Sequence, residues 1–176
     1  MRRRADENVS ELGGKGQTMS LSTYTVSFFG HREIPNMLAL EDRLLHIIRD
    51  VIIGHEYVEF LVGRNGDFDQ LAASTIRQAI RKYGCGNASM ILVLPYSKAE
   101  YRDNQREYHE YYDEVEICTA SSQAHPKAAI QVRNKAMVDR SDLVLCYIQH
   151  KNGGAYKTIK YAEKQGKTIL NLAAEY

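Results

Sequence analysis

Short apolar runs alternate with segments of helical periodicity from residue 24 to residue 172. The pattern is typical of strands at 24–30, 57–63, 88–95, 114–119, 141–148 and 167–172. It predicts helices at 37–53, 69–84, 99–115, 124–140 and 154–166, the second of which ends at a C-capping Gly84. Strands that alternate with helices in this way pair in parallel through right-handed crossovers. The sequence therefore predicts an α/β protein with a Rossmann-like, doubly wound, mostly parallel sheet and helices on both faces.

The length of 176 residues suits one domain whose core needs no metal or disulfide. We expect residues 22–176 to form that domain. Residues 1–21 are polar and contain a Gly-Gly-Lys-Gly run, so we expect a disordered tail there. The tail lacks the apolar stretch of a secretory signal, and no window approaches the ~20 apolar residues of a membrane helix. These features predict a cytoplasmic protein without a membrane partner.

Charge and cysteine content limit the functional classes further. Lys and Arg number 23 against 22 Asp and Glu, and a net charge of +1 provides no general field that would attract nucleic acid. Nucleic acid is therefore not the expected partner, and anion recognition must be local. Cys85, Cys118 and Cys146 lack zinc-binding spacing, so we expect reduced thiols, no metal and no cofactor. Cys146 lies in an apolar run and is expected to be a buried hydrophobic residue.

The loop after the first predicted strand is a candidate ligand site, because such sheets bind ligands beyond the carboxyl ends of their strands. It contains Gly30, His31 and Arg32. Glycine allows close backbone approach, histidine is a neutral donor or a weak cation, and the arginine fork suits phosphate or carboxylate. The alternative for Arg32 is a surface ion pair with Glu33 or another carboxylate.

The loop after the second predicted strand contains Gly63, Arg64 and Asp69. Its glycine spacing differs from the dinucleotide fingerprint, so it gives no reason to infer NAD. Asp67 or Asp69 is available to cap the helix that follows. Alternatively, Asp69 accepts a hydrogen bond from a ribose hydroxyl.

The segment that follows the fifth predicted strand contains two adjacent glycines directly before a helix. Its residues are Asn152, Gly153, Gly154, Ala155 and Tyr156. A helix start has unpaired amides and the positive end of the helix dipole, so it can hold a phosphate where no side chain intervenes. We therefore predict a phosphate-binding loop at this helix start.

Five stretches, FFGHRE, FLVGRNGDFDQLAA, ILVLPY, VRNKAMVDRSDLVLCYI and NGGAYKTIKYAEKQGKTILNL, together resemble the SLOG superfamily. The resemblance covers residues 25 to 172 and is to its branch of small single-domain bacterial, YpsA-like proteins. It implies a Rossmann-like module that binds a nucleotide or an ADP-ribose-like ligand as a sensor, with an effector protein or a second copy as partner. The positions that match are Gly30, His31, Arg32, Gly63, Asp69, Pro95, Tyr96, Arg133, Asn134, Gly153, Gly154 and Ala155. The resemblance also implies that Arg102 faces the ligand.

Two other functions follow from relatives within that superfamily. Cytokinin-activating phosphoribohydrolases cleave nucleoside monophosphates, but this sequence departs from their signature at Asn134, Asn152, Tyr156, Lys157, Ile159 and Lys160. The acidic positions of that signature are replaced, although such cleavage needs a carboxylate. We therefore assign no catalytic residue and keep this hydrolysis as the first alternative. DNA-processing A proteins make single-stranded DNA binding the second.

The polar segment 99–115 carries Tyr101, Tyr108, Tyr111 and Tyr112. Such a row can stack on bases. The preferred interpretation is an amphipathic helix whose tyrosine face packs on the sheet or on a second subunit.

Overall fold

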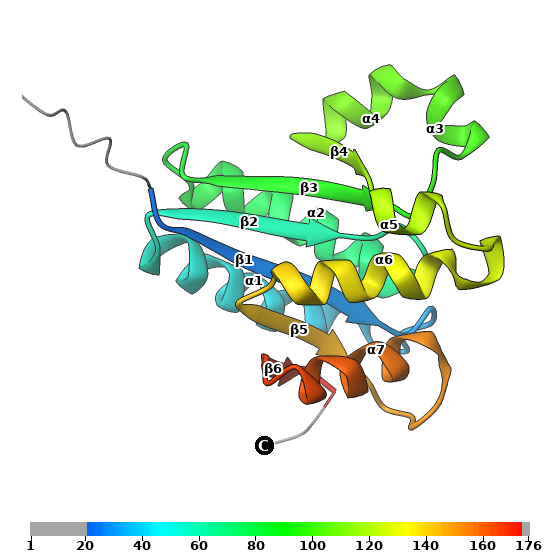
Figure 1. The fold of residues 1–176 in the computed structure, drawn as a ribbon. Coiled ribbons are helices and arrows are strands. Elements are labelled where there is room, and N and C mark those ends of the chain that lie inside the picture. Colours follow the sequence, from blue (N-terminus) through cyan, green and yellow to red (C-terminus); the bar gives the residue numbers. More distant parts are fainter. Residues whose placement is uncertain (1–20, 174–176) are drawn as a thin grey trace, which may run out of the picture.

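The computed structural model describes residues 21–173, so the tail predicted at 1–21 lies outside the described residues except for Leu21. The described chain forms one six-stranded sheet in the order β4-β3-β2-β1-β5-β6 (Figure 1). Every neighbouring pair in this sheet is parallel. The strands are β1 Thr23–Gly30, β2 Tyr57–Val62, β3 Ala88–Leu94, β4 Glu114–Ile117, β5 Leu143–Tyr147 and β6 Thr168–Asn171.

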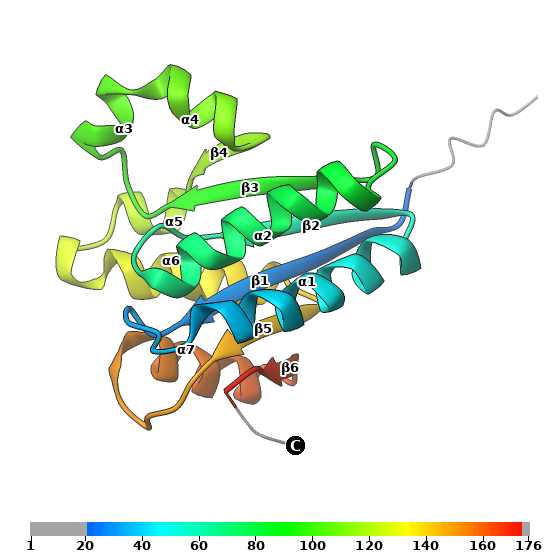
Figure 2. The same ribbon diagram turned by 180° about the vertical axis from the view of Figure 1, so that it is seen from behind.

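The helices are α1 Met37–Gly54, α2 Asp67–Tyr83, α3 Ala99–Asp103, α4 Gln105–Tyr111, α5 Thr119–Ser122, α6 Pro126–Arg140 and α7 Gly153–Lys164. Helices α6 and α7 cover one face of the sheet, and α1 and α2 cover the other (Figures 1 and 2). The predicted doubly wound α/β architecture is therefore confirmed. No helix among residues 21–173 has the length and apolar content needed to cross a membrane.

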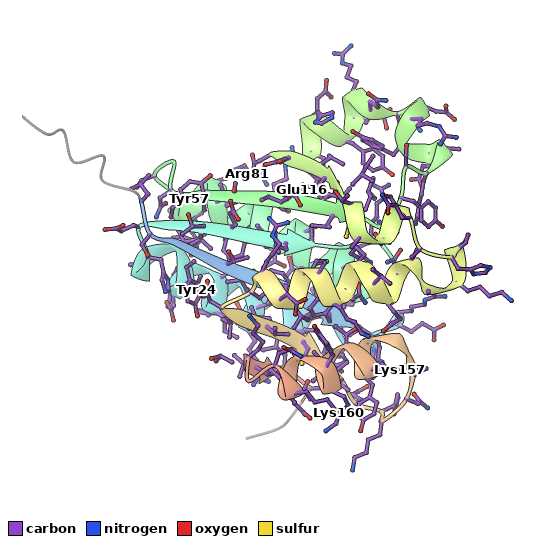
Figure 3. The ribbon with its side chains drawn as sticks, in the orientation of Figure 1. Tyr24, Tyr57, Arg81, Glu116, Lys157 and Lys160 are labelled. Atoms are coloured by element: carbon purple, nitrogen blue, oxygen red, sulfur yellow. The ribbon has the colours of Figure 1, made fainter. Side chains whose placement is uncertain are left out.

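The two faces of the sheet bury separate apolar cores. Successive strand residues point to opposite faces, so Phe28 packs in the core under α1 and α2, whereas Phe29 packs in the core under α6 and α7. Cys146 is fully buried in the second core, as predicted, and burial raises the pKa of its thiol to about 12. Arg140 of α6 donates to Glu116 of β4, and Glu116 is labelled in Figure 3.

The connections reverse direction at β1, which lies between β2 and β5. From β1 the chain builds outward through β2 and β3 with α1 and α2 on one face. Through β5 and β6 it builds the other way, with α7 on the opposite face (Figure 2). In an open parallel sheet the loops diverge at such a switch point and leave a crevice. Gly30, at the end of β1, and Gly153, at the start of α7, lie at this point.

The segment 99–115 differs from the prediction of one helix. It forms the short helices α3 and α4, which break at Asn104. The amide of the Asn104 side chain donates to the carbonyl of Glu100, a contact that competes with helix continuation. Tyr108 and Tyr112 are buried and pack against each other, so the tyrosine face packs within the chain. The short helix α5 was not predicted from the sequence.

We predict that Gly30→Ala is strongly destabilising. A Cβ atom at position 30 would lie 2.4 Å from Cγ of the fully buried Phe68, so β1 and α2 could not keep their spacing. Overpacking of this kind costs about 1–3 kcal/mol. Urea unfolding curves would measure the change.

Gly54→Ala is the matched control for this substitution. A Cβ atom at Gly54, the last residue of α1, meets nothing within 4 Å. Because alanine favours helix, the control should be neutral or stabilise by up to about 1 kcal/mol. Equal effects of the two substitutions would contradict the packing argument.

Candidate functional site

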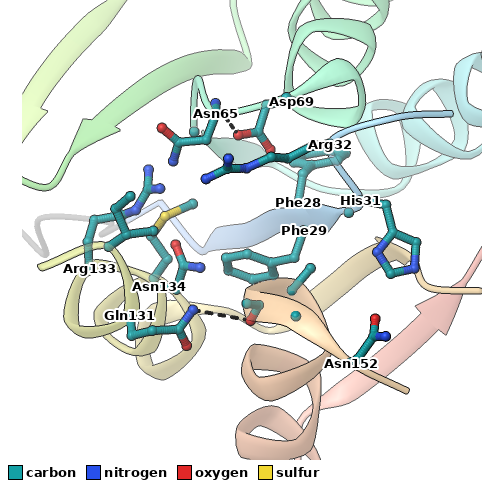
Figure 4. Close-up of a pocket in the computed structure, with 18 of the residues that line it drawn as sticks. Phe28, Phe29, His31, Arg32, Asn65, Asp69, Gln131, Arg133, Asn134 and Asn152 are labelled. Atoms are coloured by element: carbon teal, nitrogen blue, oxygen red, sulfur yellow. Dashed lines mark hydrogen bonds between the residues drawn. The ribbon is translucent and has the colours of Figure 1, made fainter. Parts of the chain in front are cut away.

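A pocket of about 470 Å³ lies at the carboxyl ends of β1 and β2, between the starts of α6 and α7 (Figure 4). The loops after β1, β2 and β5 all reach it. It includes these residues predicted from the sequence: Gly30, His31, Arg32, Gly63, Asp69, Arg133, Asn134, Asn152, Gly153, Gly154 and Ala155. The topology therefore brings together side chains that are more than a hundred residues apart in sequence.

The start of α7 forms one wall of the pocket. Gly153 has φ of 84°, a left-handed conformation that other residues adopt only with strain. A Cβ atom there would meet nothing within 4 Å, so the space in front of the helix start is open. Asn152, the N-cap residue, makes no capping hydrogen bond from its side chain. The first amides of α7 therefore remain available to a ligand.

Gln131 of α6 fixes the position of this helix start. Its Nε2 atom donates to the carbonyl oxygen of Gly154 at 3.2 Å (Figure 4). A Cβ atom at Gly154 would lie 2.8 Å from the same nitrogen. Thr158 Oγ1 also donates to this carbonyl and accepts from Asn134. The contacts join α6 and α7 through the carbonyl and leave the amides uninvolved.

His31 holds the loop between β5 and α7. Its Nε2 atom accepts from the backbone N–H of Gln149 at 2.9 Å and of His150 at 3.1 Å. An acceptor Nε2 requires the neutral ring with its proton on Nδ1. Burial, and then the neighbouring His150, lower the pKa of His31. His31 is thus neutral, and its ring supports the loop between β5 and α7 rather than carrying positive charge.

Asp69 and Arg133 meet at Gly63 in the depth of the pocket. A Cβ atom at Gly63 would lie 2.7 Å from Asp69 Oδ2 and 3.0 Å from Arg133 Nη1, so only glycine leaves room for both. Asp69 Oδ2 accepts a hydrogen bond from the backbone N–H of Asn65 at 2.8 Å (Figure 4). Burial raises the pKa of Asp69, and this amide and Arg133 oppose the rise.

Arg133 is only 2% exposed. Its Nη1 donates to the carbonyl of Val93 at 2.6 Å, whereas its buried Nε has no partner in the described chain. Burial lowers the pKa of this guanidinium, and the charge of Asp69 counteracts the effect. A buried donor without a partner is costly, and this one belongs to a side chain that lines the pocket.

The two carboxylates expected as caps have other roles. Gly66 is the N-cap residue of α2, and no side chain caps that helix. Asp67 accepts from the amide of Ile34 and so joins α2 to the loop after β1. Asp69 binds the Asn65 amide as described. The expectation of an aspartate cap is therefore wrong, because a glycine in extended conformation occupies the cap position.

Arg32 lies exposed at the mouth of the pocket. Its backbone packs on Gly66, where a Cβ atom would lie 2.6 Å from Arg32 Cα, and its carbonyl accepts from Asp67 N. Within residues 21–173 its guanidinium forms no ion pair or hydrogen bond, including the surface pair with Glu33 that was the alternative. Arg32 is therefore available to an anion.

Five predicted residues do not line this pocket: Arg64, Pro95, Tyr96, Arg102 and Tyr156. Arg64 points to the α3 and α4 segment, where it pairs with Glu100 at 3.2 Å and lies over the ring of Tyr108. Arg102 donates to the carbonyl of Ser97. Both guanidinium groups contact the segment between β3 and β4, and sequence periodicity does not predict the position of that segment relative to the sheet.

Four lining residues on α6 were not predicted from the sequence. Lys127, Ile130, Gln131 and Met137 share one face of that helix with the predicted Asn134. Their spacing of three or four residues is the signal that could have found them. The other residues missed are Phe28, Phe29, Asn65 and Gly66.

Cationic side chains outnumber anionic side chains in the lining of the pocket. Arg32, Lys127 and Arg133 are cationic, whereas Asp69 is the one carboxylate among the lining residues. Asp69 already binds an amide and lies beside Arg133. Within residues 21–173 no three His, Cys, Asp or Glu side chains gather as metal ligands do. The excess of positive charge suits the site to an anionic ligand.

Comparison with solved structures places this fold among known ones. DNA processing protein A from Streptococcus pneumoniae superposes with a TM-score of 0.59 at 14% identity. The Rossmann-like fold is shared. DNA processing protein A from Helicobacter pylori, a single-stranded DNA-binding protein, gives 0.56 at 15% identity. The molybdenum cofactor carrier protein from Chlamydomonas reinhardtii gives 0.56 at 13% identity.

The coverage of these matches differs. They cover 84%, 83% and 88% of this chain, but 49%, 63% and 79% of the respective neighbours. The chain thus spans about half to two thirds of the length of the two DNA processing proteins. No protein-family model matches the sequence, and no curated protein is significantly similar to it. At these identities the likeness shows the fold alone.

We predict that His31 makes folding stability fall in mild acid. Its pKa in the folded chain lies below the ordinary 6.5, so the unfolded chain binds the proton more readily. The contribution of neutral His31 is complete above pH 6.5 and is lost as pH falls from there through the folded pKa. Thermal unfolding between pH 8 and pH 5 would measure it.

His31→Gln is the matching variant, because its amide oxygen can accept without titrating. The variant should lose stability less steeply with falling pH than the wild type. Identical slopes would show that another group causes the pH dependence.

Proposed function

We propose that this chain binds a nucleotide or nucleotide-derived ligand of the ADP-ribose type as a sensor or regulatory module. The observation that carries the proposal is the uncapped start of α7, which opens on a pocket that also contains a buried, partly unsatisfied Arg133. A phosphate at this position would accept from backbone amides and meet the positive end of the helix dipole. Arg32 would supply further charge from the mouth of the pocket.

The interior of the pocket suits the remainder of such a ligand. Asp69 retains acceptor capacity beside the amide that it already binds, so it can accept from a ribose hydroxyl. Phe29 and Met137 provide apolar surface on the side of α6. Most small-molecule sites combine such apolar walls with a few placed polar groups.

The fold supports membership of the SLOG superfamily as part of the same proposal. Its neighbours include a single-stranded DNA-binding protein and a carrier of molybdenum cofactor. A Rossmann-like fold hosts many ligands, so these neighbours support ligand binding without naming the ligand. A sensor also requires a partner that responds to its ligand-bound state, and we propose that this partner is an effector protein or a second copy of the chain.

Phosphoribohydrolase activity is the first alternative. Cleavage of the N-glycosidic bond needs a carboxylate near the anomeric carbon, and only Asp69 among the lining residues could provide it. Glu163 of α7 pairs with Lys160 outside the pocket lining. The binding function is preferred because it needs no second carboxylate.

Single-stranded DNA binding is the second alternative, and the fold of the DNA processing proteins favours it. The net charge of +1 offers little of the phosphate neutralisation on which such binding depends. A gel shift with single-stranded DNA that weakens steeply with salt would favour this alternative over a small ligand.

We predict that Gly153→Val abolishes the thermal stabilisation caused by a nucleotide ligand. The valine side chain would fill the open space before α7 and cover its first amides. A ligand at a hundred times its dissociation constant stabilises by about 2.7 kcal/mol, so loss of the shift is readily measured. A thermal-shift panel of ADP-ribose, NAD, AMP and cyclic dinucleotides provides the test.

Gly166→Val is the matched control. Gly166 also has positive φ, 66°, and open space around it, but it follows the carboxyl end of α7. Both variants carry similar backbone strain, and only the first should lose the ligand response. A retained response in Gly153→Val would contradict the proposal, and release of free base from AMP that requires Asp69 would favour the hydrolase.

A further inference from the structure

Lys127 lies on the pocket wall that faces α7, and no role was predicted for it from the sequence. It belongs to the first turn of α6 and is exposed. Within residues 21–173 its ammonium group has no ion pair or hydrogen bond, whereas Lys160 and Lys167 are both engaged. Lys127 is therefore an uncompensated charge at the mouth of a pocket that already holds Arg32 and Arg133.

The two helix starts that face each other across the pocket differ in chemistry. His125 caps α6: its Nδ1 accepts from Lys127 N, and its carbonyl accepts from the amides of Ala128 and Ala129. The start of α7 has no side-chain cap. Backbone amides can therefore bind an anion at α7, but at α6 the side chain of Lys127 must do so.

Helix geometry places Lys127 next to the anion site at α7. Gln131, on the same face of α6, contacts the carbonyl of Gly154 and so marks the level of the α7 start. Lys127 is one turn, about 6 Å, further toward the amino end of α6. That end projects beyond the carboxyl ends of the strands (Figure 1). A flexible lysine there can reach a group adjacent to an anion at α7.

The balance of charge indicates how many anionic groups the pocket accommodates. Asp69 offsets Arg133 in the depth of the pocket, which leaves Arg32 and Lys127 uncompensated at its mouth. A single phosphate at α7 would leave part of this charge unmatched. Two linked phosphates would match both the helix start and the two exposed cations.

We infer that Lys127 is a specificity-determining residue that contacts the second phosphate of the ligand, so that the pocket selects nucleoside diphosphates over nucleoside monophosphates. The inference rests on the proposed function and makes it more specific. The buried Arg133, with its unpartnered Nε, is the independent sign that the pocket is built for a ligand. Lys127 sets which ligand of that class binds best.

The test is calorimetric titration of the full chain with ADP, AMP, adenosine and ADP-ribose at constant ionic strength in the presence of EDTA. The wild type should bind ADP about tenfold more tightly than AMP, and adenosine most weakly. Lys127→Gln should weaken the affinity for ADP about five- to tenfold, while the affinity for AMP should change less than about twofold. Lys127→Arg should retain most of the preference.

Lys135→Gln is the matched control on the same helix. Lys135 is exposed, lies outside the pocket lining and places its ammonium group over the ring of Tyr161. Its substitution therefore removes one positive charge without removing a contact to the ligand. If both variants weakened ADP binding equally, the effect would come from the loss of one positive charge anywhere on the helix, and the inference would be overturned.

Two further outcomes separate the inference from the proposed function. If AMP and ADP bind equally and Lys127→Gln changes neither, the pocket still binds nucleotides and the inference alone fails. If the wild type binds none of ADP, AMP and ADP-ribose, the proposed function fails and the inference falls with it.

Discussion

Close packing at the carboxyl ends of β1 and β2 depends on glycine at three positions. Gly30 lets the ring of Phe68 reach the sheet, and Gly66 lets the chain at Arg32 lie on the start of α2. Gly63 leaves the volume in which Asp69 and Arg133 approach each other. A Cβ atom at any of them would come within 3 Å of a neighbour. The shape of the pocket floor and of one side therefore depends on the lack of a side chain at these three glycines.

Most of the architecture could be predicted from the sequence because most long elements carry a local pattern. The strands β3 and β5 are apolar runs, β1 and β2 end in apolar runs followed by glycine, and α1, α2 and α7 show one apolar face. Helix α6 has no such apolar face and was recognised from Pro126 near its first turn. The excursion between β3 and β4 was not. Its polar residues are compatible with a continuous helix, and the break at Asn104 depends on a local side-chain contact. The packing of Tyr108 and Tyr112 beneath Arg64 is a tertiary property that no local pattern encodes.

The site was predictable to the extent that topology determines it. Loops that follow parallel strands meet at one edge, so the sequence alone predicts that Gly30, Gly63 and Gly153 lie close together. Orientation could not be predicted in this way. Arg64 is adjacent to Gly63 in sequence but faces α3, and His31 uses its ring to hold a loop. The short helix α5 separates Lys127 from the end of β4, and only the packing of α6 along the pocket places Lys127 there.

The fold and the ligand chemistry have separate origins in this molecule. The crevice at the switch point and the open start of α7 follow from chain topology and a pair of glycines. Structural neighbours with 13% to 15% identity share that topology. The groups that would distinguish one anion from another, Lys127, Gln131 and Arg133, all lie on α6. Lys127 is exposed and has no partner within residues 21–173, so substitution there can change ligand choice without disturbing the sheet, whereas Arg133 also binds the carbonyl of Val93 in β3. Ligand identity is therefore better inferred from α6 than from the proteins that this fold resembles.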